Sequence, residues 1–372
     1  MSRIKVTEVS SDTNIGGAGK CLLTLLENMN RGEFDVDVIL PENSLLKPEV
    51  EKLGVKVTEV KGIADKSLDL KAVKELKRIF KKTKPDIVHT HASMSARIAA
   101  KRAHCKVVYT RHSVFEPSKK ISQGLGKVIN GAVNNHYADA IIAVAEAAKE
   151  NLTDTGVKAG KISVILNGVD GLSPVSSDEK RLISERFNLP DGYKAVSIVA
   201  RLEEVKGHEY FIEAADILFR RGVKARFYIA GTGSCEEKLK EKVKSLNRQE
   251  QIIFTGFIKD VDRLMAITDV QANASYGTEA TSLALLEGMS LGIPAVVSDF
   301  GGNPGVIKDG VNGFVVPKCD AKSLADKIEL LLKDEDIYDE MSDGARKIFR
   351  NTFTSAAMTR QTEDVYRSLI HG

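Results

Sequence analysis

Short apolar, β-branched segments alternate with helix-like segments along the whole chain, and this alternation limits the fold more than any other feature. Several of these segments are nearly all apolar, as expected for strands that are buried on both faces of a parallel sheet. We expect strands over residues 4–11, 34–40, 55–60, 86–92, 106–113, 140–145 and 162–166, and again over 194–201, 225–233, 251–257, 270–275, 294–302 and 313–317. The pattern predicts an α/β fold with two doubly wound, Rossmann-like domains.

The alternation breaks once, at residues 167–180, where Gly, Pro and Ser interrupt it. A chain of 372 residues is also too long for one ordinary core. We therefore expect a first domain over residues 1–168 and a second over 169–353. The remaining segment, about 354–372, is predicted to be a helix that packs back onto the first domain.

Composition favours a cytoplasmic protein. No apolar run approaches the roughly 18 residues that a membrane span requires. The first residues run directly into a strand pattern, so we expect no signal peptide. The cysteines are far apart and contain no C-x-x-C pair, which predicts reduced thiols and no zinc knuckle; they are Cys21, Cys105, Cys235 and Cys319.

Charge is divided unevenly between the two halves. Residues 1–168 contain 27 Lys and Arg against 19 Asp and Glu, whereas the remainder contains 27 against 32. One interpretation is a chance distribution over solvated surfaces. The other is that the first half faces an anionic partner, such as a membrane surface or a phosphorylated acceptor. No compact basic motif with interleaved aromatic residues points to nucleic acid.

A glycine-rich turn follows the first strand. Gly16 and Gly17 open the next helix, where bare backbone and the helix N-terminus allow a phosphate or sugar to approach. The alternative is a tight strand–helix connection without a ligand. The spacing is not G-x-G-x-x-G, and no acidic residue ends the second strand, so NAD binding is not expected.

Two cations follow the first strand of the second half. Arg201 ends that strand and Lys206 lies five residues further on, just before the next helix. Anionic ligands bind at this carboxyl edge of open α/β sheets. An Arg fork and a Lys point charge together suit a diphosphate, although ordinary solvated charge is the alternative.

The segment over residues 274–302 combines carboxylates with an apolar helix. Glu279 lies in a loop, and a helix is expected from about Ser282 with Glu287 inside it. The backbone N–H groups near Ser282 and Leu283 can form an anion site. Glu287 can accept hydrogen bonds from sugar or ribose hydroxyls. Two surface glutamates are the alternative, which the apolar flanking residues disfavour.

The histidines and the D-x-D pairs do not predict a metal site. His89 and His91 alternate along one strand and so face the same side. They lack a third ligand at a suggestive spacing, so we expect satisfied buried histidines rather than a zinc site, with an acceptor contact as the alternative for His91. The pairs at residues 35–37 and 260–262 do not end a strand beside the expected phosphates.

Taken together, these motifs resemble the large family of retaining glycosyltransferases with the GT-B fold, family four. The resemblance spans nearly the whole chain and rests on IGGAG, DIVHTHAS, YTRHS, ADAIIAVAE, ILNGVD, GTG, FTGF and GTEATSLALLEGMSLGIPAVVSDFGG. It implies two domains that face each other across a cleft. It also implies metal-independent transfer from a UDP- or GDP-sugar to a glycan, glycolipid or small-molecule acceptor, with no further cofactor.

The resemblance implies a role for each matching residue. Arg201 and Lys206 would neutralise the donor diphosphate. Glu279 would hydrogen-bond the transferred sugar, Glu287 would hold the ribose, and His112 would lie beside the sugar at the reaction centre. Further contacts to the donor or the cleft are implied for Gly16, Gly17, Gly231, Phe257, Ser282 and Leu283.

The carboxylates also bear on the mechanism. A double displacement requires a nucleophilic carboxylate and an acid about 5 Å apart. Only Glu279 is expected near the sugar, so we favour front-face transfer in which the departing phosphate takes the acceptor proton. Alternatives on similar architectures are a nucleotide-sugar epimerase, a phosphorylase, which needs a pyridoxal-phosphate lysine, and a two-lobed sugar-binding protein, which needs a signal peptide.

Two basic amphipathic stretches lie in the first half, over residues 71–84 and 118–133. The second follows His112 and carries Lys119, Lys120 and Lys127 beside an apolar stripe. It could rest on anionic lipid and present a lipid-linked acceptor, which predicts peripheral contact with the inner face of the membrane. The alternative is that both stretches are ordinary helices covering the first sheet.

Overall fold

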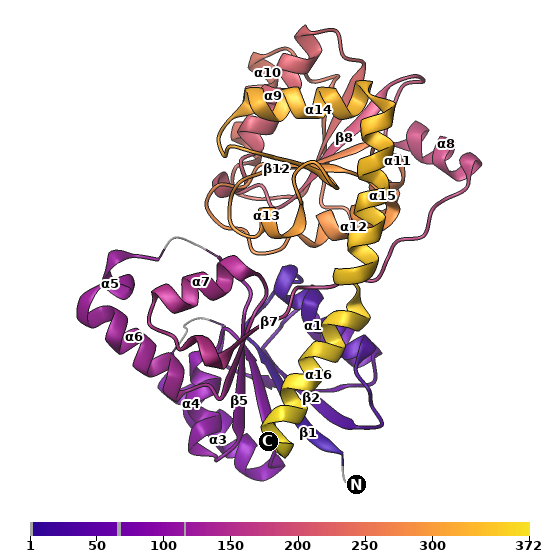
Figure 1. Cartoon of the computed structure of the whole chain (residues 1–372). Helices are drawn as coiled ribbons and strands as arrows, with labels where there is room; N and C mark the ends of the chain where they lie inside the picture. Colours follow the sequence, from indigo (N-terminus) through magenta and orange to yellow (C-terminus); the bar gives the residue numbers. More distant parts are fainter. Residues whose placement is uncertain (1–2, 65–67, 115–116) are drawn as a thin grey trace. The chain divides into compact units, whose positions relative to one another are not determined.

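The computed structural model describes residues 3–64, 68–114 and 117–372. The chain divides into two compact units (Figure 1). One unit contains Met1–Gly168 together with Ser355–Gly372, and the other contains Val169–Thr354. Each unit is built on one parallel sheet with helices on its faces, so the predicted α/β class with two Rossmann-like domains is confirmed.

The first unit has a seven-stranded sheet in the order β3-β2-β1-β4-β5-β6-β7. The strand order reverses between β1 and β4, which is where such sheets bind ligands at their carboxyl ends. In the register of this pair, Glu8 lies opposite His89 and Ser10 lies opposite His91. The strands are β1 Ile4–Ser10, β2 Phe34–Pro41, β3 Lys56–Val60, β4 Ile87–His91, β5 Lys106–Arg111, β6 Ala140–Ala143 and β7 Ile162–Val164.

Helices cover this sheet, and the last helix of the chain is among them. That helix, α16, packs against α1 and contributes the fully buried Tyr366 to the core of the first unit. The helices are α1 Gly17–Asn28, α2 Leu46–Lys52, α3 Leu70–Thr83, α4 Met94–Arg102, α5 Lys119–Ser122, α6 Gly124–His136, α7 Glu146–Asp154 and α16 Ser355–His371. None of the helices in the described part of the chain combines the length and apolar character needed to cross a bilayer.

The two basic stretches differ in how they pack. The apolar stripe of α3 is buried, including Val73, Leu76 and Phe80, so α3 is an ordinary amphipathic helix covering the sheet. Residues 118–133 do not form the single helix expected, because the chain breaks before Gly124, which has a φ of 53°.

Helix α6 buries only Gly131. Three of its apolar side chains are exposed, with Leu125 73% exposed, Val128 65% and Ile129 55%. The alternative that this stretch covers the first sheet is therefore wrong.

The second unit has a six-stranded parallel sheet in the order β10-β9-β8-β11-β12-β13. Its strands are β8 Lys194–Val199, β9 Ala225–Ala230, β10 Ile252–Gly256, β11 Val270–Asn273, β12 Ala295–Ser298 and β13 Gly313–Val316. Its helices are α8 Ser177–Arg186, α9 His208–Arg220, α10 Glu236–Ser245, α11 Val261–Ile267, α12 Leu283–Leu291, α13 Asn303–Val306, α14 Ala321–Lys333 and α15 Glu335–Thr352.

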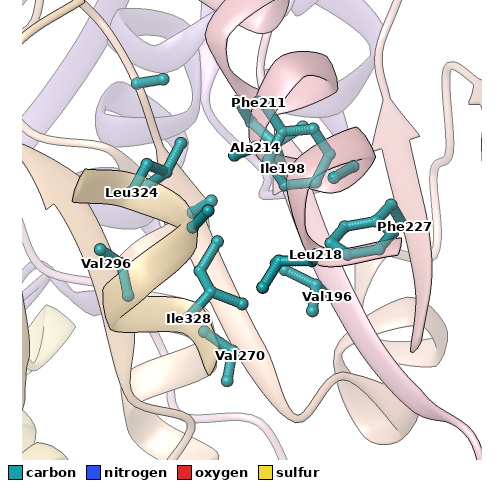
Figure 2. Packing of buried hydrophobic residues seen from close by; sticks show 14 of the residues in the cluster. Val196, Ile198, Phe211, Ala214, Leu218, Phe227, Val270, Val296, Leu324 and Ile328 are labelled. Carbon is teal, nitrogen blue, oxygen red and sulfur yellow. The ribbon is translucent and has the colours of Figure 1, made fainter. Parts of the chain in front are cut away.

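The core of this unit lies between the sheet and helices α9 and α14. Figure 2 shows Phe211 and Leu218 of α9 and Ile328 of α14 facing the side chains of the strands. Each large side chain buried here stabilises the fold by about 1.5–3 kcal/mol. This packing holds the strands rigidly, so their carboxyl ends place the following loops at fixed positions.

Candidate functional site

Glycines bring three loops of the second unit together at the carboxyl edge of its sheet. A Cβ on Gly207, whose φ is 68°, would lie 2.0 Å from the carbonyl oxygen of Ala274. A Cβ on Gly231 would lie 2.0 Å from the carbonyl oxygen of Ala200. Any side chain at either position would force these loops apart, so the glycines are required by close backbone approach.

Lys206 and Glu279 meet at this edge. The Lys206 Nζ lies 2.9 Å from a carboxylate oxygen of Glu279 and also donates to the carbonyl oxygen of Thr278 at 2.8 Å. The two side chains are only 12% and 8% exposed, so water screens the pair weakly. The structure thus joins two residues that the sequence predicted separately as diphosphate and sugar contacts.

Glu279 is held by further polar residues that sequence reasoning missed. The same carboxylate oxygen accepts hydrogen bonds from Asn273 Nδ2 and Ser275 Oγ, each at 3.1 Å. Behind them, the buried Asn303 contacts Ser298 Oγ at 3.1 Å. Polar residues in and just after the apolar strand β11 were the available signal, since a buried polar group needs a partner.

Arg201 lies five residues before Lys206 in the sequence but does not join this cluster. Its side chain is exposed and forms no ion pair or hydrogen bond within residues 3–64, 68–114 and 117–372. An exposed guanidinium at a strand's carboxyl end that forms no ion pair or hydrogen bond among these residues is available to an anion. An exposed, unpaired cation at this position is compatible with the diphosphate contact that the sequence predicts.

Helix α12 begins where the sequence indicated. Ser282 is the N-cap residue and makes no side-chain capping bond, so the first N–H groups of α12, from Leu283 on, have no intrahelical acceptor. Glu287 lies in the second turn and is half-buried. These N–H groups form the kind of anion site that the sequence predicted.

The remaining glycines and Phe257 differ in their surroundings. Phe257 is 67% exposed and follows Gly256, whose carbonyl oxygen accepts from the Gly231 N–H at 2.9 Å.

In the first unit, a Cβ on Gly16 or Gly17 would meet nothing within 4 Å. Packing therefore does not require glycine at the start of α1, and the space beside it is open to a ligand.

The first unit contains a buried polar cluster around Glu8. His91 Nε2 lies 3.0 Å from one carboxylate oxygen of Glu8, and His89 Nδ1 lies 3.3 Å from the other. Tyr366 from α16 donates to Glu8 at 2.7 Å. His89 and His91 do lie on one side of β4, with ring centroids 4.6 Å apart, and both are buried and hydrogen-bonded as predicted.

The argument that these histidines lack a third ligand is wrong. Glu8, His89 and His91 form a group whose ligand atoms all lie within 4.8 Å of one another, which suits a divalent cation in its chemistry. The sequence could not show this, because β1 and β4 are neighbours only in the folded sheet. The D-x-D pairs at residues 35–37 and 260–262 belong to no such group among the described residues.

His112 extends this cluster. Its Nε2 lies 2.7 Å from His91 Nδ1, and the two rings stack with centroids 5.0 Å apart. His112 is half-buried and lines a recess of about 30 Å³ together with His91 and Thr110. The predicted reaction-centre histidine is thus tied directly to the Glu8 cluster.

Burial dominates the protonation of these groups. It lowers the pKa of His89, and it lowers the pKa of His112 well below the usual value, with the neighbouring histidines adding to the effect. Burial would raise the pKa of Glu8, but the charge and hydrogen bonds of His89 and His91 lower it below its usual value. The cluster therefore holds an ionised carboxylate and a neutral His112 at pH 7.

Comparison with known proteins covers both units. A family model described as Glycosyl transferases group 1 matches residues 179–348, and one described as Glycosyltransferase Family 4 matches residues 15–171. The chain is 27% identical to the UDP-Gal:alpha-D-GlcNAc-diphosphoundecaprenol alpha-1,3-galactosyltransferase of Escherichia coli, over 99% of this chain and 98% of that protein. It is 25% identical to the N-acetyl-alpha-D-glucosaminyl L-malate synthase of Bacillus anthracis, over 81% and 80%.

Solved structures share the fold. A glycosyltransferase from Rickettsia africae superposes with a TM-score of 0.86 at 21% identity, and all of both chains is covered. Anabaena HepE, solved with UDP and glucose, superposes with a TM-score of 0.85 at 20% identity, over 98% of this chain and 100% of that one. These likenesses confirm the GT-B type of architecture for the two Rossmann-like units.

Proposed function

Since the chain belongs to the group 1, family 4 glycosyltransferases, we propose that it transfers a hexosyl or N-acetylhexosaminyl group from a UDP-sugar with retention of configuration. The observation that supports this proposal is the nearly buried Lys206–Glu279 pair in the loops at the carboxyl edge of the second sheet. Arg201, which follows β8 at the same edge, is exposed and has no ion pair among the described residues. UDP is favoured over GDP because relatives of this chain use or bind uridine nucleotides, as their names state.

In this proposal the donor diphosphate is held by Arg201, Lys206 and the first N–H groups of α12. Two cations and a helix N-terminus supply the positive potential that a leaving diphosphate requires, so transfer needs no metal ion. Lys206 then divides its three N–H donors between Glu279, the Thr278 carbonyl and the phosphate.

Glu279 and His112 contact the transferred sugar, and Glu287 binds the ribose hydroxyls. Three hydrogen-bond donors converge on one oxygen of Glu279, namely Lys206, Asn273 and Ser275. A carboxylate held this way keeps its orientation, which suits it to bind hydroxyls rather than to attack the sugar. Front-face transfer, in which the departing phosphate takes the acceptor proton, fits this role.

We propose a lipid-linked acceptor over a free sugar. The Escherichia coli relative acts, by its name, on a diphosphoundecaprenol-linked sugar. In this chain, Leu125, Val128 and Ile129 of α6 are exposed, and Lys119, Lys120 and Lys127 accompany them. No acidic residue occurs between residues 117 and 138, so this surface is both apolar and basic, as an anionic lipid surface requires.

The proposal is tested by incubating the protein with a panel of UDP- and GDP-sugars and measuring slow hydrolysis of each donor. Hydrolysis of one or a few UDP-sugars would support it and would identify the donor. Hydrolysis of GDP-sugars alone would overturn the nucleotide assignment. Interconversion of sugars without release of the nucleotide would instead favour an epimerase.

A further inference from the structure

Glu8 is a fully buried carboxylate in the middle of β1, and it contacts no lysine or arginine in the part of the chain that the structure describes. Its partners are the Tyr366 hydroxyl, His89 Nδ1 and His91 Nε2. An ionised carboxylate can only accept hydrogen bonds. Each of these partners must therefore present a hydrogen to it, and His91 must carry its proton on Nε2.

The position of the proton on His91 determines which nitrogen of His112 is protonated. A His91 ring that carries its one proton on Nε2 has a bare Nδ1, which can only accept. Its neighbour at 2.7 Å is His112 Nε2, which must then carry the hydrogen of that contact. A neutral His112 with its proton on Nε2 has a bare Nδ1.

We infer that Glu8 is a positioning residue that acts through His91 to fix the tautomer of His112, so that His112 Nδ1 accepts a hydrogen bond from a hydroxyl of the transferred sugar. This inference rests on the proposed function, in which His112 contacts that sugar. A carboxylate that orients one imidazole and sets its tautomer is a recurring device in enzymes. Here His91 lies between the carboxylate of Glu8 and the imidazole of His112, whose tautomer is fixed.

The fold holds the three residues rigidly. Glu8 and His91 come from the neighbouring strands β1 and β4, and His112 follows β5, which pairs with β4 so that His91 lies opposite Thr110. The stacked rings of His91 and His112 are inclined by 27°. Rotation of either ring would break the contact of 2.7 Å between them.

A bound cation is the competing reading of the same cluster. Glu8, His89 and His91 could ligate one, but hydrogen bonds already engage both carboxylate oxygens and all four ring nitrogens. Tyr366 Oη lies 2.6 Å from His89 Nδ1, so this nitrogen already has a hydrogen-bond partner. The hydrogen-bonded network is therefore the reading that the geometry favours.

The test compares the wild-type protein with Glu8→Gln, because an amide can donate as well as accept and no longer dictates the proton position. Nitrogen-15 spectra of the histidine rings report the tautomer without substrate. We expect wild-type His112 to be protonated on Nε2 and bare on Nδ1, and Glu8→Gln to show a mixture of both tautomers. Wild-type His112 protonated on Nδ1, or an unchanged tautomer in Glu8→Gln, would overturn the inference.

Two variants act as controls. Asp37→Asn makes the same acid-to-amide change on the neighbouring strand β2, at a position paired with Thr7 rather than with Glu8, and should leave the His112 tautomer unchanged. Tyr366→Phe removes another partner of Glu8 but keeps the contact to His91, and should also leave it unchanged. If Glu8→Gln does not fold, Tyr366→Phe provides the test instead. A shift of its His112 tautomer to the mixture found in the unfolded protein would count against the inference.

Kinetics separate this inference from the proposed function. We expect Glu8→Gln to lower kcat at least tenfold while its affinity for UDP stays within twofold, since UDP binding is assigned to residues of the second unit. Failure of the wild-type protein to bind UDP or to use any UDP-sugar would refute the proposed function and leave the tautomer result standing. Stoichiometric zinc in the wild-type protein that is lost in Glu8→Gln would overturn the inference in favour of a metal site.

Discussion

The ammonium group of Lys206 and the carboxylate of Glu279 lie 2.9 Å apart in a nearly buried pair, although 73 residues separate them in the sequence. Each charge compensates the other in surroundings that would otherwise disfavour both. The pair thus links stability to ligand binding, because the same ammonium group is proposed to hold the donor diphosphate. Two consequences can be measured separately.

We expect Arg201→Ala and Lys206→Ala each to weaken UDP binding by about 2–4 kcal/mol and to nearly abolish transfer, because each removes a cation that is proposed to hold the diphosphate. Lys224→Ala is the matched control, since Lys224 is exposed and lies at the amino end of β9. Isothermal titration calorimetry with UDP measures the affinities. Unchanged affinity in both site variants would refute this placement of the diphosphate.

The same variants should differ in stability. Arg201→Ala should leave Tm unchanged, whereas Lys206→Ala leaves Glu279 buried without its cation and should cost about 3–5 kcal/mol. The double variant Lys206→Ala/Glu279→Gln should recover much of this loss without recovering UDP binding, because no buried charge remains.

Glu279 and Glu287 should give opposite kinetic patterns. Glu287→Gln should raise the donor KM roughly tenfold with little change in kcat, because a ribose contact is equally strong in the ground and transition states. Glu279→Gln should lower kcat by about 10–100-fold, the range expected for loss of a charged hydrogen bond. Steady-state kinetics with the identified donor measure both, and the reverse pattern would exchange the two assignments.

Periodicity predicted the fold well because it reports burial directly. All thirteen expected strands occur, and most of their bounds differ from the prediction by one to three residues. The expected helix over residues 118–133 is wrong in its continuity, because the pattern of apolar residues does not register the positive φ of Gly124. The sequence also could not show that the apolar stripe of α6 is exposed, because the spacing of the apolar residues is the same in a buried and in an exposed stripe.

The site was predictable only where a single segment carries the chemistry. Arg201, Lys206 and Glu279 stood out because they follow strands in polar, glycine-containing loops. The cluster around Glu8 depends on strand order, and its partner Tyr366 lies 358 residues away. One local signal existed, because Glu8 lies in a strand that also contains the apolar Ile4, Val6 and Val9, and a carboxylate buried in such a strand requires hydrogen-bond donors.

Transfer should proceed in the presence of EDTA and give a product with the anomeric configuration of the donor. The reason is that Arg201, Lys206 and the α12 N-terminus are proposed to stabilise the leaving diphosphate, and that front-face transfer retains configuration. Product NMR and assays with and without EDTA or added Mg²⁺ measure both properties. An inverted product, or activity that requires a divalent metal, would exclude this mechanism.

His208 should make the protein less stable in mild acid. Burial, with a further contribution from Lys206, lowers its pKa to about 4, and neither ring nitrogen has a partner among the described residues. In the unfolded chain its pKa is about 6.5. As the pH falls from about 6.5 to 4, the unfolded chain therefore takes up a proton that the folded protein does not, and the free energy of unfolding falls by about 3 kcal/mol.

Urea unfolding between pH 4 and 7.5 tests this prediction. His208→Leu should flatten the dependence over that range, while His136→Leu, at an exposed position at the end of α6, should leave it unchanged. An equally steep dependence in His208→Leu would show that other groups cause it.

The surface of α5 and α6 should bind vesicles that contain acidic lipid. Each lysine near such a surface contributes about 1 kcal/mol, so Lys119, Lys120 and Lys127, together with the exposed apolar side chains of α6, should give weak, salt-sensitive association. Changing the three lysines to Glu should abolish sedimentation with acidic vesicles at low salt. Changing Leu125, Val128 and Ile129 to Ser should weaken it without unfolding the protein, because these side chains are already exposed.

Helix α3 supplies a control with the same change of charge. Lys71, Lys74 and Lys81 are exposed on a helix whose apolar face is buried, so converting them to Glu tests net charge alone. If that variant loses vesicle binding as completely as the α5–α6 lysine variant, general basicity is responsible and the α6 surface has no special role. If the wild-type protein binds no acidic vesicle even at low salt, the acceptor is a soluble molecule and the lipid-linked assignment is wrong.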